Sequence, residues 1–91
     1  MNYNLSYTEQ AKVDLMRLLK DEPKSYCKAM SLIAEVCEHP RTGTGRPEQL
    51  QGEPHGRWSR RITRKHRLVY EIRDREVIVL VLTAYGHYDD K

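Results

Sequence analysis

The sequence predicts an α+β domain with the element order β-α-α-β-β-β, in which two helices pack on one face of an antiparallel sheet of about four strands. Two amphipathic segments follow each other between residues 8 and 40, and three strand-like segments follow between residues 57 and 85. The late segments are joined by short connections, which favour antiparallel pairing. We expect residues 1–91 to form this single domain, because 91 residues are enough for one hydrophobic core.

The first half of the chain has the pattern of a short strand followed by two helices. Residues 2–7 alternate weakly, and either Ser6 or Thr8 suits the N-cap of a first helix that ends near Lys20. Apolar residues recur in that helix at helical spacing: Ala11, Leu15, Leu18 and Leu19. Pro23 suits the first turn of a second helix. We expect the apolar stripe of the second helix to face the core: Tyr26, Met30, Ile33 and Cys37, widened by Ala29, Leu32 and Val36.

The stretch Gly56–Tyr70 carries six cationic residues and no Asp or Glu. Its apolar residues alternate with polar ones, as in a strand with one buried face: Trp58, Ile62, Leu68 and Tyr70. We therefore expect two strands, Arg57–Thr63 and Arg67–Arg73, joined by a turn at residues 64–66. A last, strongly apolar strand, Glu76–Tyr85, is expected in the centre of the sheet.

The alternation separates the cations by face. Arg57, Arg61 and Arg67 fall on the face that the helices leave open, whereas Arg60 has the phase of the core side. An open basic face on a rigid sheet suits a polyanionic ligand.

The charge distribution supports such a ligand. Residues 1–40 hold five Lys or Arg against six Asp or Glu, and residues 41–91 hold eleven against seven. The basic excess therefore belongs to the second half, which indicates nucleic acid before membrane. No apolar run reaches the roughly 18 residues of a membrane span, and the polar N-terminus does not resemble a signal peptide, so we expect a cytoplasmic protein.

The sequence offers no pattern for a metal or a cofactor. The glycine-rich loop RTGTGRP lacks the spacing of a phosphate-binding loop, and the histidines show no metal-ligand spacing with the cysteines. We expect neither a metal nor a cofactor.

Candidates for proton transfer flank the basic stretch. Glu48 follows the glycine-rich loop, and His87 and Tyr88 follow the last strand. Metal-free RNA cleavage needs a base for the 2′-hydroxyl, cations for the pentacovalent phosphorane and an acid for the leaving 5′-oxygen. On residue types alone, a plain nucleic-acid-binding face is the favoured interpretation.

Four motifs resemble the YoeB/Txe toxins of the RelE-like superfamily: Gly45-Arg46-Pro47-Glu48, WSRRIT at residues 58–63, HRLVY at residues 66–70 and His87-Tyr88. The resemblance covers essentially residues 40–88. It implies a RelE-like fold and the toxin of a type II toxin–antitoxin pair. It also implies a ribosome-dependent endoribonuclease that cuts mRNA in the ribosomal A site, inhibits translation and is neutralised by a YefM-like antitoxin.

The resemblance also implies roles for individual residues. Glu48 corresponds to the general base, His87 to the general acid and Tyr88 to the residue that orients the reacting nucleotide. Arg67 corresponds to the arginine that stabilises the phosphate. The further cations expected to contact RNA or phosphate are Arg46, Arg57, Arg61, Arg64 and Lys65.

Partners follow from the same resemblance. We expect the antitoxin, the 70S ribosome with its mRNA, operator DNA through the antitoxin complex, and a homodimer. The chain departs from the family pattern at Gly86, where a larger residue is common, and in its tail Asp89-Asp90-Lys91. Two rival functions stay open: a non-catalytic toxin of the same fold, such as a ParE-like gyrase inhibitor, and an autoregulatory module that binds RNA or DNA.

Overall fold

Two helices follow a short strand, β1 (Asn4–Tyr7), in a computed structural model that describes residues 2–51 and 56–86. Helix α1 (Glu9–Asp21) is capped by Thr8, whose Oγ1 accepts a hydrogen bond from the N–H of Ala11 at 3.0 Å. Thr8, not Ser6, is therefore the cap. Helix α2 (Pro23–Glu38) begins with Pro23 in its first turn, as predicted.

The apolar face of α2 packs on the core, as predicted. Its buried residues are Ser25, Ala29, Leu32, Ile33 and Val36. Ile33 and the three residues expected to widen the stripe are fully buried, while Tyr26 and Met30 are partly buried and pack against the core. The centre of the buried face therefore lies on the residues that widen the stripe, and Tyr26 and Met30 lie at its margin.

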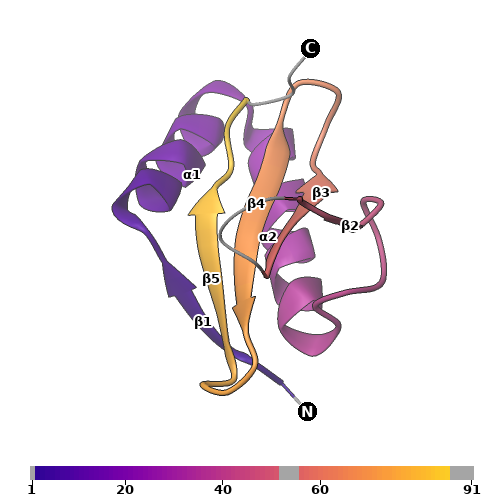
Figure 1. Cartoon of the computed structure of the whole chain (residues 1–91). Helices are drawn as coiled ribbons and strands as arrows, with labels where there is room; N and C mark the ends of the chain where they lie inside the picture. The colour runs from indigo at the N-terminus through magenta and orange to yellow at the C-terminus, as the bar shows by residue number, and fades with distance from the viewer. Residues whose placement is uncertain (1, 52–55, 87–91) are drawn as a thin grey trace.

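One mixed sheet of five strands has the order β1-β5-β4-β3-β2. The later strands are β2 (Glu48–Gln49), β3 (Arg57–Arg61), β4 (Arg67–Arg73) and β5 (Ile78–Thr83), and they pair antiparallel in sequence order. Strand β1 pairs with β5 in parallel, from Asn4 opposite Ile78 to Tyr7 opposite Val81. Both helices lie on one side of the sheet (Figure 1).

The α+β class and the two helices on one face are confirmed, and two details of the sheet differ from the prediction. The expected sheet was antiparallel with about four strands. The additional strand is β2, which has only two residues, and β1 runs parallel to β5. Short turns impose antiparallel pairing only on the later strands, whereas β1 meets a partner remote in sequence, so no turn fixes its direction.

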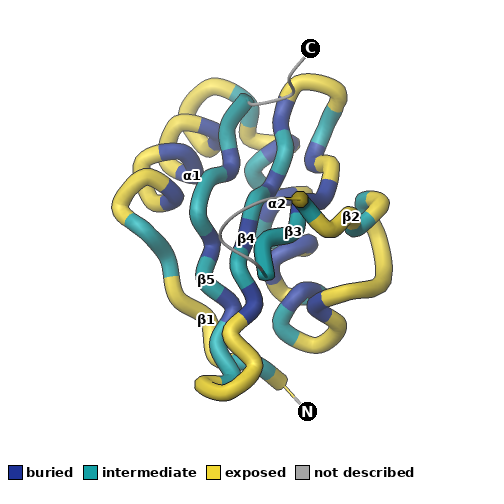
Figure 2. Tube along the Cα trace, viewed as in Figure 1, coloured by how far each residue is buried: buried dark blue, intermediate teal, exposed yellow. Residues whose placement is uncertain are grey.

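The core lies between the helices and the inner face of the sheet. Along β4, Leu68, Tyr70 and Ile72 are buried and alternate with partly exposed residues, and Val79 and Val81 do the same in β5 (Figure 2). This alternation confirms that Arg67 stands on the face opposite the helices. Within residues 2–51 and 56–86, neither helix has the length and apolar character needed to cross a bilayer.

Candidate active site

Two arginines face each other at the tip of the β3–β4 hairpin. Arg61 ends β3, Arg67 begins β4, and the two are partners in the strand register. Residues directly opposite each other share one face of a sheet, so both stand on the open face. Like charges in this position destabilise a sheet. The pair therefore concentrates positive potential at one place, where an anionic ligand would be stabilised.

Glu48 stands beside this pair on the same face. Strand β2 pairs with β3 so that Glu48 lies opposite Ser59, which is two residues before Arg61. Because side chains two residues apart point to the same side, the carboxylate and the two guanidinium groups share one surface. Glu48 is the first residue of β2, and its side chain is exposed.

The loop that leads into β2 is fixed against the end of β3. The N–H of Arg61 donates to the carbonyl of Gly45 at 2.7 Å. Gly45 has φ +85°, and a Cβ there would lie 3.0 Å from the Arg61 carbonyl oxygen, so the position favours glycine. The next residue, Arg46, also has a positive φ, of 54°. Such conformations in non-glycine residues cost free energy and are concentrated at functional sites.

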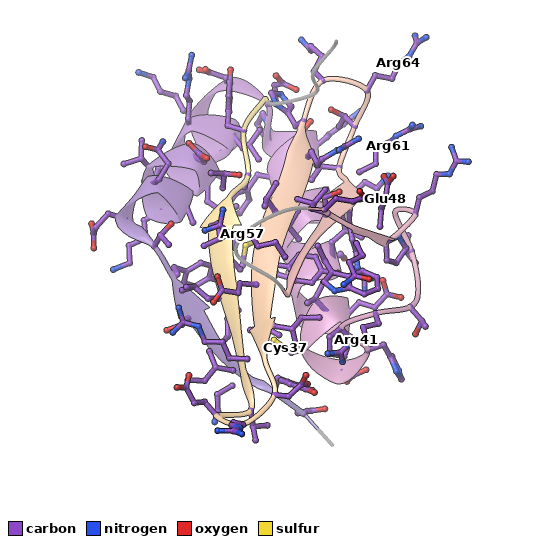
Figure 3. All side chains as sticks on the ribbon, in the orientation of Figure 1. Cys37, Arg41, Glu48, Arg57, Arg61 and Arg64 are labelled. Atoms are coloured by element: carbon purple, nitrogen blue, oxygen red, sulfur yellow. The ribbon has the colours of Figure 1, made fainter. Side chains whose placement is uncertain are left out.

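These elements enclose an open pocket of about 410 Å³ on the open face of the sheet. Its lining consists of Gly45, Arg46, Pro47, Glu48, Ser59, Arg61 and Arg67. Glu48 and Arg61 lie close together beside β2 in Figure 3. Among the residues described, Glu48 is the single carboxylate in a lining with three arginines. A proton acceptor next to clustered guanidinium groups suits chemistry on a phosphate ester.

A buried arginine holds the wall of this pocket. The side chain of Arg60 is 0% exposed, and it donates to Glu35 Oε1 at 2.8 Å and to the Tyr70 hydroxyl at 3.1 Å. It also donates to three carbonyls of the loop after α2, those of His39, Thr42 and Thr44. Burial raises the pKa of Tyr70, so its hydroxyl stays protonated and donates to the carbonyl of Pro40 at 2.7 Å. The cluster fixes the loop that continues into Gly45 and Arg46.

The alternation of β3 predicted the direction of Arg60 but not its function. Arg60 has the phase of Trp58 and Ile62, which face the helices, and the structure confirms its burial. The sequence gives no sign that the loop carbonyls after α2 would be its partners, because they lie 16 to 21 residues away in the chain.

A sequence model of a protein family matches residues 7–88, and its description is "YoeB-like toxin of bacterial type II toxin-antitoxin system". The match covers nearly the whole chain. The chain belongs to the family of YoeB-like toxins. The resemblance inferred from the four motifs is thereby confirmed.

Individual relatives of this YoeB-like toxin agree. Toxin RelK of Mycobacterium tuberculosis is 40% identical over 85 residues, covering 93% of this chain and 98% of RelK. A YoeB/ParE toxin from Agrobacterium tumefaciens has a TM-score of 0.86 at 32% identity, covering 93% of this chain and 99% of its own. YoeB of Staphylococcus aureus, solved in a heterotetrameric YoeB-YefM complex, has a TM-score of 0.80 at 28% identity, covering 97% and 100%.

The other predicted site residues of this YoeB-like toxin lie apart from the pocket or outside the described residues. Arg57 is at the opposite end of β3 from Arg61, with its Nε 3.7 Å from Glu71 (Figure 3). Arg64 and Lys65 are exposed in the turn of the β3–β4 hairpin, and Lys65 Nζ is 3.8 Å from Glu22. The predicted acid and the nucleotide-orienting residue, His87 and Tyr88, lie outside the described residues. In the described part of the chain, no group of three or more His, Cys, Asp or Glu could hold a metal ion.

Proposed function

We propose that this YoeB-like toxin is a ribosome-dependent mRNA endonuclease that cleaves in the ribosomal A site and thereby inhibits translation. The observation that supports this function is the pocket in which Glu48 stands beside the opposed Arg61 and Arg67. A basic face for binding alone needs no carboxylate among its cations, since a carboxylate weakens the attraction for phosphate. A cleavage site needs a proton acceptor, and the carboxylate of Glu48 can serve as one.

The reaction is an in-line transfer at phosphorus that uses only groups of the protein and the RNA. Glu48 takes the proton of the 2′-hydroxyl, and the 2′-oxygen attacks the adjacent phosphorus. Arg67 and Arg61 stabilise the negative charge of the phosphorane, and His87 donates a proton to the 5′-oxygen as its bond to phosphorus breaks. The products are a 2′,3′-cyclic phosphate and a 5′-hydroxyl.

The remaining cations are assigned to binding. Arg46 lines the pocket and contacts a phosphate next to the scissile one, and Tyr88 orients the reacting nucleotide. Arg57, Arg64 and Lys65 stand outside the pocket, and we assign them to ribosomal or messenger phosphates. The 70S ribosome supplies the mRNA in the geometry that in-line attack requires.

The same basic face is the proposed binding site for a YefM-like antitoxin. YoeB of Staphylococcus aureus is solved in complex with YefM and also as a dimer. An antitoxin segment with acidic side chains would pair with Arg61 and Arg67 and exclude mRNA from the pocket. We extend the antitoxin complex and the dimer to this chain. We also propose that the antitoxin complex binds operator DNA and that the protein is cytoplasmic.

Cleavage on programmed ribosomes tests this function. The purified chain should cut mRNA that is positioned on 70S ribosomes and leave the same mRNA intact when ribosomes are omitted, with Arg67→Ala as the inactive control. Binding of RNA without cleavage, unchanged by His87→Ala, would favour the binding module. Inhibition of gyrase supercoiling without cleavage of mRNA would favour the ParE-like alternative.

A further inference from the structure

His66 is a buried histidine whose two ring nitrogens are both engaged. It is 2% exposed and lies in the connection between β3 and β4, directly before Arg67. Its Nδ1 accepts a hydrogen bond from the N–H of Gly86 at 2.8 Å, and its Nε2 lies 2.9 Å from Glu22 Oε2. A backbone N–H can only donate, so Nδ1 carries the lone pair. The proton therefore sits on Nε2, which donates to the carboxylate of Glu22.

The bond from His66 is one of several that hold the three residues after β5. Asp14 Oδ2 accepts the N–H of Ala84 at 2.9 Å. The ring of Tyr85 contacts the guanidinium of Arg17, at 4.1 Å from its centroid, and the ring of His66, at 4.4 Å between centroids. Residues 84, 85 and 86 are thus each held by a side chain from elsewhere in the fold.

Gly86 is held from both of its polar backbone groups. Its N–H bonds to His66, and its carbonyl accepts the N–H of Arg67 at 3.2 Å. Strand β5 already ends at Thr83, so these bonds are not part of the ladder that closes the sheet. They fix the end of the described chain to the backbone of the residue that carries the phosphate-stabilising guanidinium. Gly86 has a φ of +67°, a conformation that favours glycine, so the geometry of both bonds suits the residue found here.

We propose that His66 is a positioning residue for cleavage: by accepting the Gly86 N–H, it fixes the point from which the chain delivers His87 to the leaving 5′-oxygen beside Arg67. This inference rests on the proposed function, in which His87 is the general acid. His66 itself does not touch the substrate. Misplacing a catalytic group by about 1 Å can cost about 10²-fold in rate, so the bond matters for cleavage even where the fold survives its loss.

Two substitutions separate the two hydrogen bonds of His66. His66→Asn places an amide oxygen near the position of Nδ1 and keeps an acceptor for Gly86 while losing Glu22. His66→Gln places an amide nitrogen near the position of Nε2 and keeps the donor to Glu22 while losing Gly86. We expect His66→Gln to reduce the single-turnover rate at saturating toxin by about 10- to 100-fold. His66→Asn should recover most of that rate, and the half-saturating toxin concentration should stay the same in both.

A modified substrate distinguishes a misplaced acid from a damaged fold. In this mRNA, sulphur replaces the 5′-bridging oxygen at the scissile phosphate. A thiol has a pKa of about 8.5, far below that of a hydroxyl group, so the thiolate leaves without a proton from an acid. We expect both His66→Gln and His87→Ala to regain cleavage on this substrate, to within about threefold of the wild-type rate.

The outcomes separate this inference from the function on which it rests. If His66→Gln matches the wild type on ordinary mRNA, or stays equally slow on both substrates while His87→Ala is rescued, the positioning role is wrong and the endonuclease stands. If His87→Ala itself cleaves ordinary mRNA at the wild-type rate, the assignment of the acid fails.

A measurement on the wild type covers the case in which His66→Gln does not fold. The Gly86 amide should be protected from hydrogen exchange, and exchange at the unstructured rate would overturn the inference.

Discussion

Replacing Arg60 by methionine tests whether a buried cation holds the wall of the pocket. The substitution keeps an apolar stem of similar length but removes the guanidinium, which donates to Glu35, to Tyr70 and to three loop carbonyls. Breaking a buried ion pair by removing one partner costs about 3–5 kcal/mol. Glu35 keeps part of its side chain in solvent and can rehydrate, so we expect a loss near 3 kcal/mol.

That loss is large against the stability of a domain of this size, about 5–15 kcal/mol in general. Urea unfolding should show it directly: with an m-value of about 1.5 kcal/mol/M, the midpoint should fall by about 2 M. Arg61→Met is the matched control, since it removes the same charge from the neighbouring, exposed position. It should change stability by about 0.5 kcal/mol or less. An Arg60→Met chain no less stable than Arg61→Met would refute the reasoning.

Substitutions at Arg67, Gly45 and Glu22 have expected effects on activity or stability. Arg67→Ala should slow single-turnover cleavage on programmed ribosomes at least as much as Glu48→Ala, by about 10²-fold or more, and a nearly active Arg67→Ala would contradict this. Gly45→Ala should destabilise the chain by about 1–3 kcal/mol in thermal unfolding, because of its φ of +85° and the nearby Arg61 carbonyl; an unchanged midpoint would argue against that geometry. The hydrogen bond from His66 lowers the pKa of Glu22 from 4.5, so this bond stabilises the fold above that pH and its contribution is lost as the pH falls through the lower, folded value. Glu22→Gln should therefore flatten the acid side of the stability–pH curve, and a curve of unchanged slope there would count against the bond.

The later strands were predictable because their pairing depends on residues that are close together in the sequence. Alternation and short turns identified β3 and β4 and placed Arg61 and Arg67 together on the open face. The parallel pairing of β1 with β5 was not predictable, because its partner lies more than 70 residues away and no turn constrains its direction.

Some residues of the candidate site were predictable from the sequence, and others were not. The family motifs selected Glu48, and the structure places it beside the arginine pair. The sequence did not reveal the hydrogen bond between His66 and Gly86, because the position of His66 in the sequence matches no metal-binding or catalytic motif. Its role depends on Glu22, which is 44 residues away, and on Gly86, which is 20 residues away. Such contacts become visible only when the fold brings the segments together.

In the proposed reaction, the 2′-oxygen of the mRNA is the nucleophile and only protein groups assist it. The most direct measurement uses mRNA on 70S ribosomes with a single 2′-deoxynucleotide immediately 5′ of the scissile bond. We expect cleavage there to disappear, while the all-ribose message yields a 2′,3′-cyclic phosphate and a 5′-hydroxyl. Cleavage of the 2′-deoxy message at the same bond, or a 5′-phosphate on the downstream fragment, would contradict the account.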